Sequence, residues 1–195
     1  MNLWPSLNVG LCYSRQLCGN IIFPSQTLLS LHVPGGQRTD ELNAAIDKSN
    51  PEGTFDLVTL LIGVNNQYRG RGVEEYRGEF SALLQRAIGF ADSKPSRVIV
   101  VSIPDWGVMP FAKDRDRKKI ANEIDAFNSI NWEESVRAGA AYADITPISR
   151  EVDRHPELIA SDGLHPSGAQ YTHWVEIIKP KALKALGFAI EKEKK

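Results

Sequence analysis

The chain alternates between short, almost wholly apolar runs and longer segments whose apolar residues recur at helical spacing. Residues 57–62 (LVTLLI) and 98–103 (VIVVSI) are bounded by turn-forming residues. Such runs are typical of strands that are covered on both faces of a parallel sheet. A third, weaker strand is expected over residues 141–145.

The segments between these runs predict helices over residues 40–48, 74–91, 117–138 and 167–185. The second and third helices carry the clearest apolar stripes, and Gly139 ends the third helix in the usual way. The stripes consist of Tyr76, Phe80, Leu83, Leu84, Ala87 and Ile88 in one helix, and of Ile120, Ile124, Phe127 and Ile130 in the other.

Strands that alternate with helices of this length predict βαβ units and a parallel sheet with helices on both faces. We expect one domain over residues 1–190, in which residues 1–35 are atypical and irregular, followed by a charged tail at 191–195. Ligands of such sheets bind beyond the carboxyl ends of the strands, so candidate chemistry is sought there.

Composition excludes several classes of protein. The 195 residues include 23 basic and 24 acidic side chains, a net charge of −1, so no basic field is available for nucleic acid. Cys12 and Cys18 cannot form a disulfide framework, and no apolar run approaches the roughly 20 residues of a membrane span. Residues 1–10 contain no Lys or Arg, so we expect a cytoplasmic protein without a signal peptide.

The segment 63–66 (GVNN) directly follows the first apolar strand. The glycine permits a sharp turn, and the amide of Asn65 is a neutral donor that can stabilise a developing oxyanion. The alternative is an ordinary turn, since Asn and Gly favour turns whatever the function.

The segment 162–166 (DGLHP) precedes the last helix. In a turn, this spacing can place the Asp162 carboxylate on Nδ1 of His165, which leaves Nε2 to act as a base. Pro166 fits the start of a helix, with Ser167 as its cap. The alternative is a loop aspartate beside an exposed histidine; His32, His155 and His173 have weaker contexts.

The segment 35–42 (GGQRTDEL) places glycines just before the first helix. Gly36 can present a backbone N–H to an oxyanion. Alternatively, Thr39 or Asp40 is a plain N-cap. The chain contains no Walker A or GxGxxG pattern, and no Cys/His cluster has metal-ligand spacing.

These three segments, in this order, resemble the SGNH hydrolases, also called the GDSL esterase/lipase family. Gly36 matches the family's glycine block, residues 63–66 match its GxND block, and residues 162–165 match its DxxH block. Asn66 stands where the family usually has Asp. The resemblance extends from residue 36 to residue 188.

The resemblance implies a flavodoxin-like three-layer α/β/α sandwich and an esterase or lipase that acts on a small-molecule ester through an acyl-enzyme. His165 would be the general base and Asp162 its orienting partner. Asn65 and the Gly36 N–H would line the oxyanion hole. No cofactor or metal would be required.

The family's first block, Gly-Asp-Ser, is missing from the chain. The nearest match is residues 9–14 (VGLCYS), which places Cys12 where the nucleophilic serine is expected, with Ser14 nearby. Because the departure is confined to the first 35 residues, that segment is altered, replaced or read in a wrong frame. Weak or absent esterase activity is therefore expected.

Two readings of the function remain open: an impaired esterase, and an inactive domain of the same fold that binds a ligand without turnover. A signalling or nucleotide domain is disfavoured because no phosphate loop follows a strand. Residues 68–72 and Trp106 could line a pocket, or be a polar loop and a packed side chain. The charged run 113–119 is expected to be a solvated helix start, and oligomeric state cannot be predicted from the sequence.

Overall fold

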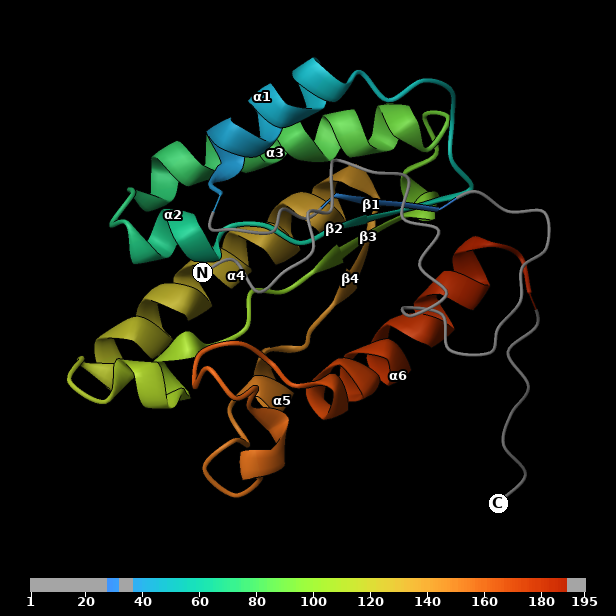
Figure 1. Ribbon diagram of the computed structural model, residues 1–195. Coiled ribbons are helices and arrows are strands. Elements are labelled where there is room, and N and C mark those ends of the chain that lie inside the picture. Colours follow the sequence, from blue (N-terminus) through green and yellow to red (C-terminus); the bar gives the residue numbers. More distant parts are fainter. Residues whose placement is uncertain (1–27, 32–36, 189–195) are drawn as a thin grey trace.

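The computed structural model describes residues 28–31 and 37–188, which form a parallel sheet between two layers of helices (Figure 1). The sheet contains β1 (Leu28–Leu31), β2 (Leu57–Leu60), β3 (Val98–Val101) and β4 (Ala141–Ala143), hydrogen-bonded in the order β1-β2-β3-β4. Val58 lies opposite Val98, and Ile99 lies opposite Ala141. The described part of the chain therefore confirms the predicted α/β class and its parallel sheet.

The helices are unequally divided between the two faces of the sheet. The longer ones are α1 (Thr39–Ser49), α3 (Val73–Phe90), α4 (Arg117–Ala138) and α6 (Gly168–Ala185); α2 (Val64–Tyr68) and α5 (Thr146–Ser149) are short. Helices α1, α3 and α4 cover one face, and α6 covers the other (Figure 1). Successive right-handed crossovers in one direction place their helices on the same face, which explains the grouping of the first three. The described chain also forms four short 3₁₀ turns, at Pro95–Arg97, Trp106–Val108, Pro110–Ala112 and Pro156–Leu158.

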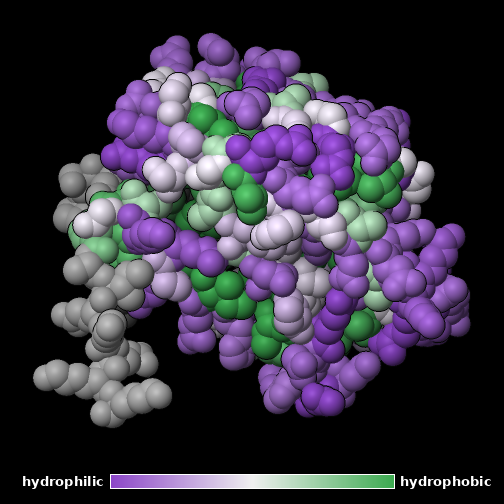
Figure 2. Space-filling view, turned by 180° about the vertical axis from the view of Figure 1, so that it is seen from behind, coloured by the Kyte–Doolittle hydropathy of each residue, from purple (hydrophilic) through white to green (hydrophobic). Residues whose placement is uncertain are grey.

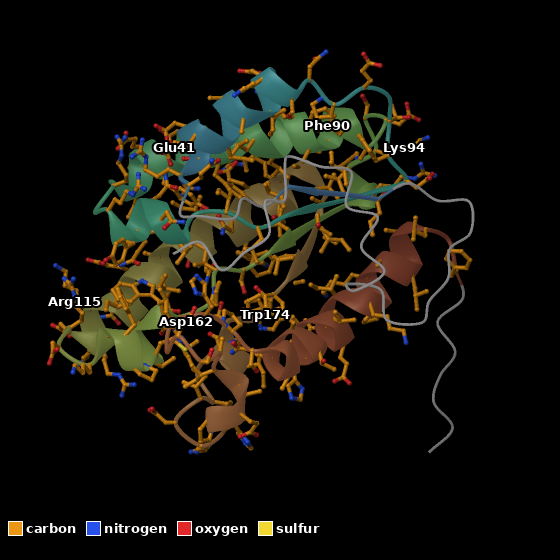
Figure 3. The ribbon with its side chains drawn as sticks, viewed as in Figure 1. Glu41, Phe90, Lys94, Arg115, Asp162 and Trp174 are labelled. Carbon is orange, nitrogen blue, oxygen red and sulfur yellow. The ribbon has the colours of Figure 1, made fainter. Side chains whose placement is uncertain are left out.

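Side chains of the strands alternate between two apolar clusters. One cluster lies under α1, α3 and α4 and includes Val58, Leu60, Val98 and Val100. The other lies under α6, where Leu57, Ile99, Val101 and Ala143 pack around Trp174. Figure 3 shows Trp174 between α6 and the sheet. Because the central strands have apolar residues on both faces, their sequences are continuous apolar runs.

The predicted helices agree with the structure to within one residue at every end. The apolar stripes are buried, apart from half-buried Ile88, and Gly139 ends α4 in a left-handed conformation with φ of 77°. The strands are shorter than expected, since β2 ends at Leu60 and β3 at Val101. The short helices α2 and α5 were not predicted, because four or five residues are too few for a helical period to show.

One short strand, β1, lies within the first 35 residues, at an edge of the described sheet. The rest of that segment, and the charged tail at 191–195, lie outside the described residues. No helix among residues 37–188 is both long and apolar enough to cross a membrane. The face shown in Figure 2 is largely hydrophilic, with hydrophobic residues in separate small areas.

Candidate active site

The DxxH segment forms a turn that is closed by its own backbone. Ile159 and Pro166 form an antiparallel bridge. The Ala160 N–H donates to the His165 carbonyl at 2.8 Å, and the Ser167 N–H donates to the Leu158 carbonyl at 2.8 Å. The turn is therefore braced on both sides before α6 begins.

Within this turn, the Asp162 carboxylate contacts the His165 ring as the spacing predicted. Asp162 Oδ2 lies 2.6 Å from His165 Nδ1, while Oδ1 accepts the backbone N–H groups of Leu164 and His165, both at 2.9 Å. These backbone bonds, followed by the imidazole bond, lower the pKa of Asp162 to about 2. The carboxylate is thus ionised at neutral pH and favours a proton on Nδ1, so that Nε2 is the nitrogen that can take up a further proton.

Helix α6 fixes the direction in which the chain leaves this turn. The Ser167 side chain caps the helix by accepting the Gln170 N–H at 3.4 Å, and its hydroxyl donates to the Glu157 carbonyl at 2.6 Å. The predicted cap is confirmed. Figure 3 shows Asp162 on the side of the sheet where β3 and β4 end.

The GVNN segment turns sharply after β2 and then forms α2. Gly63 has φ of 120°, and a Cβ at this position would overlap the Tyr76 hydroxyl and lie 2.7 Å from Ile103 Cδ1. Only glycine fits both the backbone conformation and the space. Asn65 lies in the first turn of α2, and its Nδ2 donates to the Gln37 carbonyl at 3.2 Å. An amide nitrogen carries two hydrogens, so this bond uses one of them.

Asn66 is buried and joins α2 to the start of α1. Its Oδ1 accepts the Thr39 N–H at 3.1 Å, and its Nδ2 donates to Thr39 Oγ1 at 2.7 Å and to Glu79 Oε2 at 3.3 Å. The Thr39 hydroxyl also donates to Glu79 Oε2. The N-cap of α1 is Arg38, whose N–H donates to Glu41, so the alternative of Thr39 or Asp40 as the cap is wrong.

This network gives a physical reason for Asn at a position where the family usually has Asp. The carboxylate of Glu79 lies within hydrogen-bonding distance of the Asn66 amide nitrogen. An aspartate would place an oxygen there and repel Glu79. Together, Asn65 and Asn66 bind the chain at residues 37 and 39, directly after the glycine block.

An aromatic cluster connects α2 with the Asp162–His165 turn. Trp106 lies after β3, and its indole N–H donates to Gln67 of α2 at 2.7 Å. Tyr68 and Phe111 pack against Trp106, and the Phe111 N–H donates to the Gly163 carbonyl at 3.0 Å. The segments that carry Asn65 and His165 are thus joined through this aromatic cluster. That the two side chains face one cleft at the carboxyl edge of the sheet stays a prediction.

The loop that carries Trp106 is anchored by an ion pair between buried Asp105 and half-buried Arg150. Asp105 is 1% exposed; its Oδ2 accepts Arg150 Nε at 2.9 Å, and its Oδ1 accepts the Gly107 N–H at 2.8 Å. Arg150 also contacts Asp125 at 2.7 Å. Sequence reasoning missed this pair, because the two partners are 45 residues apart.

Gly36, Cys12 and Ser14 lie outside the described residues. The charged side chains of the run 113–119 are exposed, as expected. Within the described residues, no group of three or more His, Cys, Asp or Glu side chains could hold a metal ion. His155 lies exposed near Glu157, with Nδ1 at 3.1 Å from the carboxylate.

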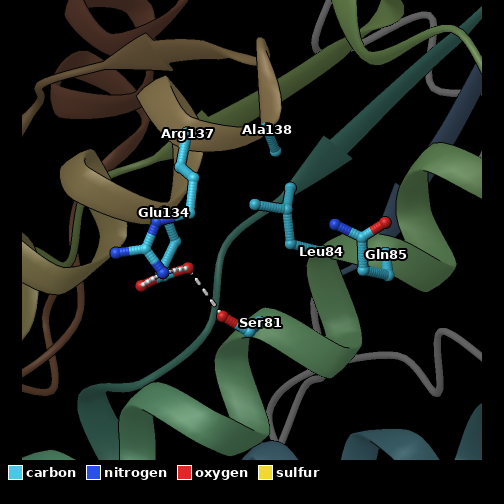
Figure 4. Close-up of a pocket in the computed structure, with 6 residues that line it drawn as sticks. All are labelled: Ser81, Leu84, Gln85, Glu134, Arg137 and Ala138. Atoms are coloured by element: carbon cyan, nitrogen blue, oxygen red, sulfur yellow. Dashed lines mark hydrogen bonds and ion pairs between the residues drawn. The ribbon is translucent and has the colours of Figure 1, made fainter.

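A small hollow between α3 and α4 lies apart from this site (Figure 4). Its polar side is the carboxylate of Glu134, which accepts bonds from Ser81 at 2.8 Å, Arg77 at 3.0 Å and Arg137 at 3.1 Å. These three donors satisfy the buried carboxylate of Glu134. Its contacts therefore hold α3 and α4 together, and they do not mark a second reaction centre.

Comparison with known protein families identifies one matching family model. Residues 25–173 match the model of the GDSL-like lipase/acylhydrolase family. No curated protein matches the chain.

Solved structures share the fold at low sequence identity. A GDSL-like lipase from Parabacteroides merdae is 17% identical, with a TM-score of 0.59 over 78% of this chain and 70% of its own. LAE5, an alpha/beta hydrolase from the metagenome of Lake Arreo, is 22% identical, with a TM-score of 0.55 over 78% and 69%. Axe2, an acetylxylan esterase from Geobacillus stearothermophilus, is 17% identical, with a TM-score of 0.54 over 82% and 72%. Because the family model spans most of the chain, the protein belongs to the GDSL-like lipase/acylhydrolase family and is a hydrolase of that class.

Proposed function

We propose that the protein hydrolyses carboxylic esters through an acyl-enzyme, with His165 as general base and Asp162 as its orienting partner. The observation that supports this most directly is the 2.6 Å contact between Asp162 Oδ2 and His165 Nδ1 in a turn closed by its own backbone. A carboxylate in this position sets the tautomer of the imidazole and stabilises the imidazolium that forms during the reaction.

In the first half-reaction, the nucleophile attacks the acyl carbon of the ester while His165 Nε2 takes its proton. The tetrahedral intermediate then expels the alcohol, which receives that proton from His165. In the second half-reaction, water attacks the acyl-enzyme, with the same histidine acting first as base and then as acid. The products are a carboxylic acid and an alcohol, and the enzyme returns to its starting state.

The negative oxygen of the tetrahedral intermediate requires donors that are already in place. We assign this role to the second Nδ2 hydrogen of Asn65 and to the Gly36 N–H. The bond from Asn65 to the Gln37 carbonyl supports the assignment, because it ties the amide to the residue that follows Gly36. Loss of one such donor slows acyl transfer about 100- to 1000-fold in enzymes of this type.

The nucleophile comes from the altered N-terminal segment, where Cys12 and Ser14 are the candidates. A Cys thiolate beside His165 would be a competent nucleophile. The Gly-Asp-Ser turn of the family would also supply an oxyanion donor, so its loss weakens catalysis in two ways. We therefore propose that turnover is slow in this chain.

Covalent labelling tests the proposal. The wild type, His165→Ala and His155→Ala are treated with a fluorophosphonate probe and, separately, with iodoacetamide. His155→Ala is the matched control, because this histidine also contacts a carboxylate at an exposed position. We expect selective modification of one serine or of Cys12 in the wild type and the control, and its loss in His165→Ala. Slow hydrolysis of p-nitrophenyl acetate should fall about 100-fold or more in the same variant.

If a folded sample shows no labelling and no turnover, the esterase proposal is overturned and a binding domain of the same fold is favoured. The missing Gly-Asp-Ser triplet is the observation that favours this alternative. A gain variant separates the two: Leu11→Asp combined with Cys12→Ser restores the triplet after Gly10. A rise in hydrolysis by orders of magnitude supports the esterase, and no rise supports the binding domain.

A further inference from the structure

A buried tyrosine of α3 contacts the backbone at the turn that follows β2. Tyr76 is 0% exposed, and its hydroxyl lies 3.1 Å from the Ile62 carbonyl oxygen. Its ring packs against Phe80 and Phe127, with centroids 5.6 Å and 4.5 Å away. Burial raises the pKa of Tyr76, so the hydroxyl keeps its proton and can donate it. A phenylalanine would fill the same space without burying a hydroxyl, so packing alone does not explain the tyrosine.

The amide of Asn131, in α4, contacts the same hydroxyl. Asn131 Oδ1 lies 2.6 Å from Tyr76 Oη, while Asn131 Nδ2 is buried without a hydrogen-bond partner. The single hydrogen of the hydroxyl cannot serve both Oδ1 and the Ile62 carbonyl. A half-turn of the amide resolves both conflicts, because Nδ2 then donates to the hydroxyl and the hydroxyl donates to Ile62. The bonds then run in one direction, from Asn131 through Tyr76 to the backbone.

Gly63, the next residue, depends on such a bond for its conformation. It has φ of 120°, and because glycine accepts both signs of φ, the residue itself does not fix the orientation of the Ile62 carbonyl. Gly63 is also the N-cap of α2, and its carbonyl accepts the Gln67 N–H at 3.1 Å. The orientation of this peptide therefore determines how α2 begins, and with it the direction of Asn65 in the first turn.

We propose that Tyr76 is a positioning residue: by holding the Ile62 carbonyl, its hydroxyl aims the Asn65 amide at the oxyanion of the tetrahedral intermediate. This rests on the proposed esterase function. The bond from Asn65 Nδ2 to the Gln37 carbonyl, at 3.2 Å, needs the same orientation of α2. The peptide before Gly63 and the amide of Asn65 thus form one unit, with Tyr76 as its fixed point.

Tyr76→Phe keeps the ring and removes only the hydroxyl, so it tests this role directly. The side-chain amide of Asn65 gives a pair of signals in a proton–nitrogen correlation spectrum, assigned by their loss in Asn65→Ala. We expect these signals to shift or broaden in Tyr76→Phe. Tyr142→Phe is the matched control, because it also removes a tyrosine hydroxyl, one that donates to the Asn128 carbonyl at 3.4 Å. The Asn65 signals should stay in place in this control.

Hydrolysis of p-nitrophenyl acetate gives a second readout. In Tyr76→Phe, kcat and kcat/KM should fall by the same factor, about 10- to 100-fold, because a displaced oxyanion donor weakens only the transition state. Tyr142→Phe should keep the wild-type values. Asn131→Leu removes the donor to the hydroxyl but keeps the tyrosine, so it should shift the Asn65 signals and lower kcat by a smaller factor. This variant also decides the case in which Tyr76→Phe does not fold.

Unchanged Asn65 signals in folded Tyr76→Phe overturn the proposal. An equal loss of kcat in Tyr76→Phe and Tyr142→Phe also overturns it, since general destabilisation would produce that result. The spectra need no turnover. If the wild type does not hydrolyse the ester, a shift of the Asn65 signals in Tyr76→Phe but not in Tyr142→Phe supports the positioning of Asn65 and rejects the esterase alone.

Discussion

Replacing Asn66 with Asp should destabilise the protein by about 2–4 kcal/mol at pH 7, a penalty that disappears in mild acid. The substitution keeps the size of the side chain and the acceptor for the Thr39 N–H. It replaces the amide nitrogen, now 3.3 Å from Glu79 Oε2, with a carboxylate oxygen. Two unit charges at this separation repel by about 5 kcal/mol at an effective dielectric constant of about 20.

Protonation sets an upper limit on this penalty. An ordinary aspartate has a pKa near 3.9, so binding one proton at pH 7 costs about 4 kcal/mol at 1.36 kcal/mol per pH unit. The new carboxyl has a raised pKa in the folded state. The folded variant therefore binds more protons than the unfolded chain, and the penalty grows as the pH rises above 4. At pH 4.5 we expect it to be below about 1 kcal/mol.

Urea unfolding followed by circular dichroism, at pH 4.5 and pH 7, measures these differences. Asn66→Ala is the first comparison: it leaves the buried Thr39 N–H without an acceptor and should cost about 1–3 kcal/mol at both pH values. The second is Asn66→Asp combined with Glu79→Gln, which removes the like-charge pair and should recover most of the loss. The reasoning is refuted if the Asn66→Asp penalty is the same at both pH values, or if the double variant recovers nothing.

Three further substitutions test other parts of the structure by urea unfolding. Gly63→Ala should cost about 2–4 kcal/mol, whereas Gly70→Ala, also at positive φ but with open space around it, should cost only about 1 kcal/mol; equal losses would contradict the overlap argument. Arg150→Met should cost about 2–4 kcal/mol because it leaves Asp105 buried without its cation, and adding Asp105→Asn should return part of this. Asp162→Asn should lower the urea midpoint at pH 7. Because the pKa of Asp162 is lowered, its contribution to the free energy of unfolding is present above about pH 4 and is lost as the pH falls towards 2. The urea midpoints of the wild type and of Asp162→Asn should therefore converge near pH 2.

The sequence predicted those parts of the fold whose signal is periodic and long. Helix α4 was predicted to the residue, because a continuous apolar stripe ends at a glycine that takes a left-handed conformation. Strands β2 and β3 were predicted from apolar runs that face helices on both sides. The contact between Asp162 and His165 was also predictable, since a spacing of three in a turn keeps both groups within one local structure.

The remaining features depend on contacts between distant parts of the chain. Glu79 meets Asn66 only because α3 packs against the start of α1, and Trp106 meets Gln67 across 39 residues. No local pattern distinguishes Glu79 or Phe111 from other surface residues of a helix or loop. Tyr68 was considered as a possible pocket residue, but only the fold shows that its ring packs against Trp106.

The closed turn at residues 159–167 has a consequence for how this enzyme family can change. Its backbone bonds, its capping serine and its Asp162–His165 contact all lie within a stretch of about a dozen residues. Such a unit keeps its shape when a distant segment is exchanged. A lineage can therefore exchange a distant strand, or lose it, while the contact between Asp162 and His165 keeps its geometry.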